Sequence, residues 1–64
     1  MRYHYEEAQL KLEEAQSEFI TIGSRLGAAQ CLQSLGDILR MQHQHQEAHL
    51  KLEEAQTEFI AIGN

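Results

Sequence analysis

The sequence of 64 residues contains no proline and no tryptophan, and it has a single cysteine. Without proline, no residue interrupts a long helix by removing a backbone donor. Because Cys31 is the only thiol, the chain cannot form an internal disulfide, and a lone cysteine favours a reducing compartment. The N-terminal residues also lack the apolar segment of a signal peptide. We therefore predict an intracellular, cytoplasmic protein.

Positive charge is scarce as well. Ten acidic residues oppose five basic ones, which gives a net charge of −5, and the basic residues are scattered along the chain. Nucleic acids and anionic membranes attract clustered positive charge, so neither is an expected partner. No apolar run approaches the roughly 20 residues that a membrane-spanning helix needs. The acidic balance is that of a solvated surface.

The sequence does contain a repeat. Residues 7–23 recur forty positions later as residues 47–63, and 14 of these 17 positions are identical. The three differences are Gln9 to His49, Ser17 to Thr57 and Thr21 to Ala61. A fixed period of about 20–50 residues is typical of stacked helical or β arrays.

Apolar residues in both copies recur every three or four positions, which is the spacing of one helix face. They are Tyr5, Ala8, Leu12, Ala15, Phe19 and Ile22 in the first copy, and Ala48, Leu52, Ala55, Phe59 and Ile62 in the second. Between them, residues 25–41 are apolar over more than half of the helix circumference, so we expect this helix to pack between two others. Gly23 suits a helix C-cap and Ser24 an N-cap. We predict helices near 4–22, 25–41 and 45–62.

The second half of the chain resembles the tetratricopeptide repeat (TPR), a pair of helices called A and B. The repeat has a characteristic order of residue types, namely large, Leu-Gly, large, Ala, large, Ala. In this chain the corresponding residues are Leu32, Leu35, Gly36, Leu39, Ala48, Leu52 and Ala55. Its later part recurs as Tyr5, Ala8, Leu12 and Ala15. The period is 40 instead of about 34, and the helix-ending proline is missing. These features are similar to the long repeats of kinesin light chains and G-protein-signalling modulators, and above all to the TPR-like repeats of basidiomycete fungal proteins.

The resemblance implies an all-α, TPR-like helical-repeat (α-solenoid) fragment with three antiparallel helices in B–A–B order. Residues 1–23 would form helix B of one repeat, and residues 24–64 a complete A–B repeat. This single one-and-a-half-repeat unit would be cut from a longer array or be an engineered copy of part of one. Gly36 would allow the close approach of helices A and B, with Ala48 opposite it.

In function, the resemblance implies a non-enzymatic module for protein–protein interaction. Ligands of the family lie along the A helices, where this chain has a polar stripe. The stripe consists of Gln30, Gln33, Ser34, Asp37 and Arg40. It lacks the lysines and asparagines with which some TPR proteins clamp a peptide carboxylate, and an ordinary solvated stripe is the alternative interpretation.

The missing neighbours of an array should leave apolar helix faces open, so we expect the chain to associate with itself, most simply as a dimer. The packing and self-association residues are the two apolar stripes together with Leu32, Leu35, Gly36 and Leu39. Residues 41–46 contain neither glycine nor proline, so nothing local forbids a continuous helix from Arg25 to Ile62. A secondary hypothesis is therefore domain swapping, in which this turn straightens.

The alternative class of protein is a small helical bundle that binds a metal ion through His45 and His49, with Glu47 nearby. Two histidines four residues apart can share zinc, but a stable site needs further ligands. Their counterparts in the first copy, Tyr5 and Gln9, are not a comparable ligand set. Heptad spacing also suggests a coiled coil as an alternative. Alanine at half of the seam positions disfavours it. No cofactor or catalytic residue is predicted, since there is no phosphate loop and Cys31 lies on an apolar helix side.

Overall fold

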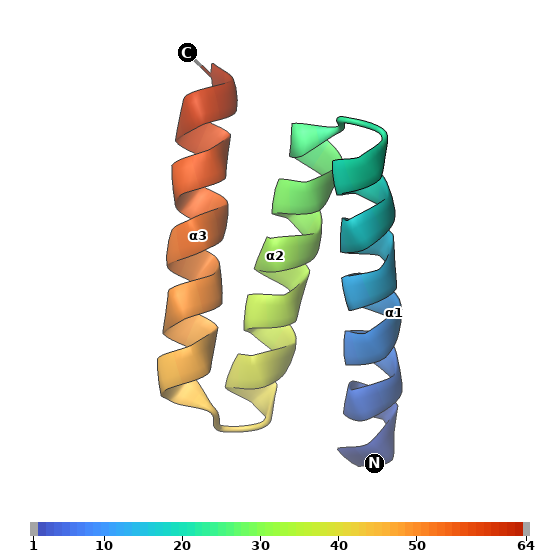
Figure 1. The fold of residues 1–64 in the computed structure, drawn as a ribbon. Coiled ribbons are helices and arrows are strands. Elements are labelled where there is room, and N and C mark those ends of the chain that lie inside the picture. Colours follow the sequence, from blue (N-terminus) through green and yellow to red (C-terminus); the bar gives the residue numbers. More distant parts are fainter. Residues whose placement is uncertain (1, 64) are drawn as a thin grey trace.

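The computed structural model describes residues 2–63, with side chains from residue 4 onwards. It contains three α-helices: α1 (Arg2–Thr21), α2 (Arg25–Met41) and α3 (His45–Gly63). Within this range no residue belongs to a β-strand, so the all-α prediction is confirmed. The chain reverses direction at each turn, and the three helices run alternately up and down (Figure 1).

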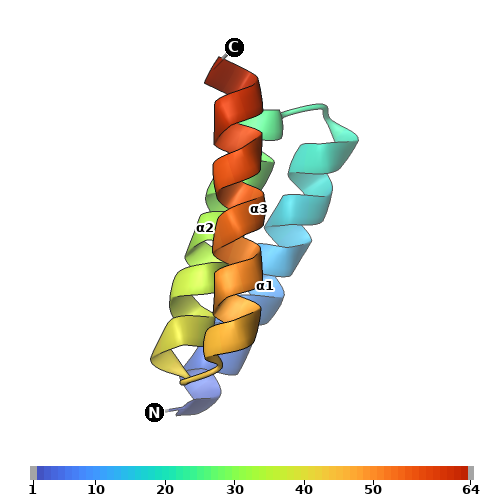
Figure 2. The ribbon, with the colours of Figure 1, turned by 90° about the vertical axis from the view of Figure 1, so that its left-hand side faces the viewer.

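Helix α2 lies between the other two and packs against both of them. Among the described residues, α1 and α3 make no packing contact with each other. Figure 1 shows the three helices side by side, and Figure 2 shows α3 in front of α2. The Cα atoms extend over 38 × 21 × 11 Å, which is close to a single layer of helices. This confirms that the middle segment, apolar on two sides, packs between two neighbours.

The core is built mainly on α2. The buried apolar residues are Ala29, Cys31, Leu32, Leu35, Leu39, Ala48 and Ala55. None of the described side chains of α1 is buried. Two residues of the expected apolar sides, Ile22 and Leu26, are 73% and 49% exposed and stay outside this core. A single layer of helices leaves one side of every rod uncovered, which explains why so few side chains are fully enclosed.

The α1–α2 turn has the hydrogen bonds of a Schellman motif. Gly23 has φ +82°, and its N–H donates to the Ile20 carbonyl at 3.1 Å. The N–H of Ser24 donates to the Phe19 carbonyl at 2.8 Å. The Ser24 hydroxyl then accepts from the N–H of Gly27 at 3.2 Å and caps α2. Gly23 and Ser24 therefore end and begin helices as the sequence predicts.

The α2–α3 turn repeats this motif with less suitable residues. His43 takes the left-handed conformation at φ +65°, and its N–H donates to the Arg40 carbonyl at 3.0 Å. The N–H of Gln44 donates to the Leu39 carbonyl at 2.9 Å. The side-chain Oε1 of Gln42 is buried without a hydrogen-bond partner among the described residues. The single chain therefore does not form a continuous helix from residue 25 to 62. The turn that interrupts it is nevertheless strained.

Two glycines bring α2 close to its neighbours. A Cβ atom on Gly36 would lie 2.7 Å from Cγ of Leu52 and 3.3 Å from the Ala48 carbonyl oxygen, both on α3. A Cβ atom on Gly27 would lie 2.5–2.7 Å from the ring of Phe19 on α1. The contact at Gly36 is the close approach that the sequence predicts. The contact at Gly27 was not predicted, although a glycine inside a helix is itself a signal that some neighbour comes close.

Candidate functional site

The nearly identical helices α1 and α3 pack against α2 through overlapping faces, whose edges are covered to different degrees. One of these, which we call the alanine face, consists of Ala8, Lys11, Ala15, Glu18 and Ile22 in α1, and of Ala48, Lys51, Ala55, Glu58 and Ile62 in α3. In α3 this face is covered: both alanines are buried, and Ile62 is 37% exposed. In α1 the same alanines are only half-buried, and Ile22 is 73% exposed. The alanine face is therefore covered more completely in α3 than in α1.

An ion pair reinforces the covered alanine face. Nη2 of Arg25 on α2 lies 2.9 Å from Oε1 of Glu58 on α3. Both side chains are partly exposed, so the pair contributes little stability and mainly fixes the register of the two helices. Glu18, the counterpart of Glu58, is exposed on α1. The difference in burial thus extends to the charged residues of the repeat.

The second face, which we call the phenylalanine face, differs between the two helices in its polar residues. It consists of Gln9, Leu12, Gln16 and Phe19 in α1, and of His49, Leu52, Gln56 and Phe59 in α3. In α1, Phe19 lies against Gly27 of α2, and Gln16 is half-buried. The identical residue Gln56 is exposed in α3. The apolar residues Leu52 and Phe59 are nevertheless half-buried like their counterparts in α1, and Leu52 lies against Gly36 of α2. The phenylalanine face therefore contacts α2 in both helices, and only its polar residues are more exposed in α3.

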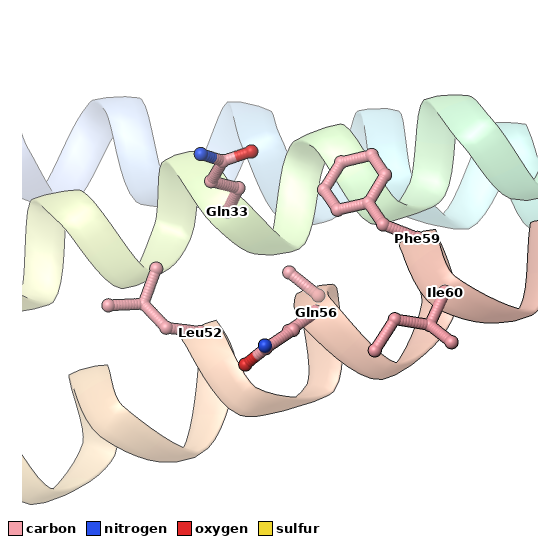
Figure 3. Close-up of a pocket in the computed structure, with 6 residues that line it drawn as sticks. Gln33, Leu52, Gln56, Phe59 and Ile60 are labelled. Carbon is pink, nitrogen blue, oxygen red and sulfur yellow. The ribbon is translucent and has the colours of Figure 1, made fainter. Parts of the chain in front are cut away.

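A shallow groove of about 390 Å³ lies between α2 and the phenylalanine face of α3. Its lining residues are Gln33 of α2 and Leu52, Ala55, Gln56, Phe59 and Ile60 of α3. Figure 3 shows Phe59 and Leu52 rising from α3 towards α2, with Gln56 and Ile60 on the outer side of the groove. The lining is mostly apolar, which suits the burial of another apolar surface.

The polar stripe predicted on residues 30–40 is accessible on α2. Gln30, Gln33, Ser34 and Arg40 are exposed, and Asp37 is half-buried. Nη2 of Arg40 lies 3.2 Å from Oδ1 of Asp37, so the two charges of the stripe pair with each other. Only Gln33 reaches the groove on α3. The stripe and the groove therefore meet at a single residue.

The histidines are exposed around the start of α3. His45 and His49 line a shallow depression with Gln46 and Leu50, and Nε2 of His49 lies 3.2 Å from Oε2 of Glu53. The rings of His43 and His45 are 5.9 Å apart and meet edge to face. Among residues 4–63, no three His, Cys, Asp or Glu side chains gather closely enough to hold a metal ion, and Glu47 does not complete such a set. The geometry thus adds nothing in favour of the metal-binding alternative.

The lone thiol lies inside the core, since Cys31 is 6% exposed. It packs there as a small apolar side chain. In the described part of the chain, no helix is both long enough and apolar enough to cross a lipid bilayer.

This sequence matches no protein-family model, no curated protein and no solved structure. The TPR resemblance therefore depends on the residues of the chain itself. The groove adds Gln56 and Ile60 to the residues named from sequence. For Gln56, a comparison of the two repeats shows why sequence could not identify it. The sequence shows that Gln16 and Gln56 are equivalent, but only the fold shows that one is covered and the other is open.

Proposed function

We propose that the chain is a non-enzymatic protein–protein interaction module, a TPR-like B–A–B repeat unit that binds other helices and copies of itself through its open helix faces. In this proposal α2 is helix A, and α1 and α3 are B helices. The unit is a segment of a longer array of the same repeat, or an engineered copy of such a segment, and its setting is cytoplasmic.

One observation supports this proposal more than any other. The same apolar stripe of the repeat packs against α2 in both outer helices, and large apolar side chains outside it, such as Ile20 and Ile60, remain exposed. A repeated helix that packs on either side of α2 is the element from which an array of such helices can be built. Solenoid repeats gain their stability from such contacts between neighbours.

Light scattering after size-exclusion chromatography tests self-association. Between about 5 and 500 µM, we expect the molar mass to rise towards that of a dimer, because burial of exposed apolar side chains favours association. The variant Ile22→Asp changes the exposed end of the alanine face of α1 and should lower the dimer fraction. Leu10→Asp is the control, because Leu10 is 62% exposed and lies outside the alanine face. A monomer at every concentration would contradict the proposed self-association.

Domain swapping is a more specific form of the proposed self-association. The α2–α3 turn combines a left-handed His43, a buried unpaired Gln42 oxygen and the residue Gln44 at the start of α3. Opening the turn into a continuous helix would relieve the left-handed conformation of His43 and the burial of the Gln42 oxygen. Helix α3 would then pack on the α2 helix of a second chain. Because His43→Gly removes the strain of the closed turn, this variant should form less dimer than the original chain. An unchanged dimer fraction would argue against the exchange.

A further inference from the structure

We propose that the side of the molecule around Leu32 and Glu58 binds a cationic amphipathic segment of another protein, in which apolar residues are flanked by lysine or arginine. This inference rests on the proposed function, since it assumes that the chain is a protein–protein interaction module. It adds the chemical class of the partner and the surface on which the partner lies.

Two adjoining depressions form this surface, which we call the acidic trough. One, of about 660 Å³, runs along α3, and its lining includes Leu32 of α2 with Leu50, Glu53, Glu54 and Glu58 of α3. The other, of about 300 Å³, is lined by residues of all three helices, which include Ile20, Arg25, Ala28, Leu32 and Glu58. Leu32 and Glu58 line both depressions, so the two adjoin at these residues.

Large apolar side chains of the acidic trough are open to solvent. Ile20 of α1 is 63% exposed and Leu50 of α3 is 59% exposed, whereas Leu32 is buried and belongs to the floor. A partner that covers the two exposed side chains gains the free energy of apolar burial. Among the described residues, none of the polar stripe of α2 lines the trough, so this surface is distinct from the ligand surface that the TPR resemblance implies.

The charge of the acidic trough determines which partner fits. Its lining has three glutamates against one arginine, a net charge of −2, and the whole chain has a net charge of −5. Arg25 pairs with Glu58. Glu53 lies against the exposed His49, whereas Glu54 has no ion-pair partner among the described residues. Lysine or arginine beside the apolar residues of a partner therefore complements these carboxylates.

A second copy of this chain is a poor occupant of the acidic trough. It would bring another net charge of −5, and its five basic residues are scattered along the sequence. Nucleic acids and anionic membranes are repelled by the same negative surface. The occupant is therefore a polypeptide segment that combines apolar and basic residues.

The acidic trough can be tested with a fluorescent amphipathic peptide of about 14 residues that consists of leucine and lysine at helical spacing. Titration with the intact chain at low salt should give saturable binding by fluorescence anisotropy. Raising the salt from about 0.05 to about 0.3 M should weaken this binding by about tenfold, because salt screens the attraction between lysine and carboxylate. A matched peptide with glutamate in place of every lysine should not bind.

The internal repeat supplies matched variants that locate the site. Glu53→Gln with Glu54→Gln removes two charges of the acidic trough. Glu13→Gln with Glu14→Gln removes the two equivalent charges of α1, which lie outside it. The α3 variant should bind the lysine peptide about fivefold more weakly or less, and the α1 variant should differ from the original chain by less than about twofold.

A second matched pair tests the apolar contact. Leu50 and Leu10 are equivalent in the repeat and similarly exposed, at 59% and 62%, but only Leu50 lines the acidic trough. Leu50→Ser should weaken binding by about fivefold, and Leu10→Ser should change it by less than about twofold. Circular dichroism of all variants checks that the helices are intact.

Each other result overturns the inference. Equal losses for the α1 and α3 variants would show that the peptide responds only to net charge. Binding that withstands salt, or that the glutamate peptide shares, would show that the carboxylates of the trough do not select the partner. Losses confined to the α1 variants would place the peptide on α1. If the α3 variants change the dimer fraction and leave peptide binding unchanged, the trough faces a second copy.

The inference and the proposed self-association fail separately. A chain that stays monomeric in light scattering yet binds the lysine peptide through α3 contradicts only the self-association. A chain that forms dimers but gives no saturable binding of the peptide contradicts only the inference.

Discussion

His43 and Gly23 occupy equivalent positions in two turns of the same type. Only Gly23 is suited to the backbone conformation of that position. Both have positive φ, +65° for His43 and +82° for Gly23, and both donate the hydrogen bond that ends a helix. A residue with a Cβ atom is disfavoured there by roughly 1–2 kcal/mol, whereas glycine is not. The second turn is therefore the point where a single substitution should improve the fold.

We predict that His43→Gly stabilises the chain by roughly 0.5–1 kcal/mol. The relief of the left-handed conformation exceeds the extra entropy that glycine gives to the unfolded chain. Urea unfolding followed by circular dichroism measures the change. The reciprocal control is Gly23→Ala, which should destabilise by about 1 kcal/mol because nothing but its φ opposes a side chain there. Equal or lower stability of His43→Gly would show that the turn is not strained.

The pairing of helices depends on glycines placed on opposite sides of α2. Gly27 admits α1 and Gly36 admits α3, so each neighbour approaches closely at one point. Adding a methyl group at either point has two opposing effects. Alanine favours a helix over glycine by about 1 kcal/mol, whereas overpacking a fitted contact costs about 1–3 kcal/mol.

For Gly36→Ala we expect overpacking to win, with a net destabilisation of about 1 kcal/mol. The new methyl group would meet Leu52 at its branch point and the Ala48 carbonyl on the backbone, so neither can move aside freely. In a Leu52→Ala background the same substitution should become neutral or stabilising. A double-mutant cycle from thermal or urea unfolding isolates this coupling. Additive effects would mean that the two residues do not compete for space.

The sequence alone predicted the helices closely. The expected ranges 4–22, 25–41 and 45–62 compare with Arg2–Thr21, Arg25–Met41 and His45–Gly63 in the structure. The repeat gives two copies of one pattern, and Gly23 with Ser24 marks a boundary that local chemistry alone determines. Gly36 was also predicted to face α3, because a glycine inside a helix needs a packing reason.

The use of each helix face could not be predicted in the same way. Gln16 and Gln56 have nearly the same neighbours in sequence, so no local pattern explains why Gln16 is half-buried and Gln56 is exposed. Their difference depends on which side of α2 each outer helix occupies, and this is a property of the chain as a whole. The left-handed His43 escaped prediction for a related reason, because tertiary packing of α3 on α2 overrides the local preference for a continuous helix.

As a whole, the molecule is unevenly held together. Most buried side chains lie on α2, two lie on α3, and none of the described ones lies on α1. Regions with few buried apolar contacts open more readily than the rest of a fold. The order of local stability should follow this order of burial.

We therefore predict that amides in the middle of α1 exchange with deuterium faster than those in the middle of α2, by about tenfold or more. Native-state hydrogen exchange read by nuclear magnetic resonance measures both helices in one sample. The near-identity of α1 and α3 offers an internal control, since their intrinsic exchange rates are almost equal. Equal protection of α1 and α3 would show that opening is global and not local.

The interchangeable use of the two outer helices also bears on how such a chain can change in length. Each copy of the seventeen-residue segment packs against α2 through the same apolar stripe, although the two copies lie on different sides of that helix. A gene that gained another forty-residue unit by slippage between these similar stretches would need no further adaptation, because every new junction would join surfaces that already fit. Growth by duplication is thus compatible with folding from the first event.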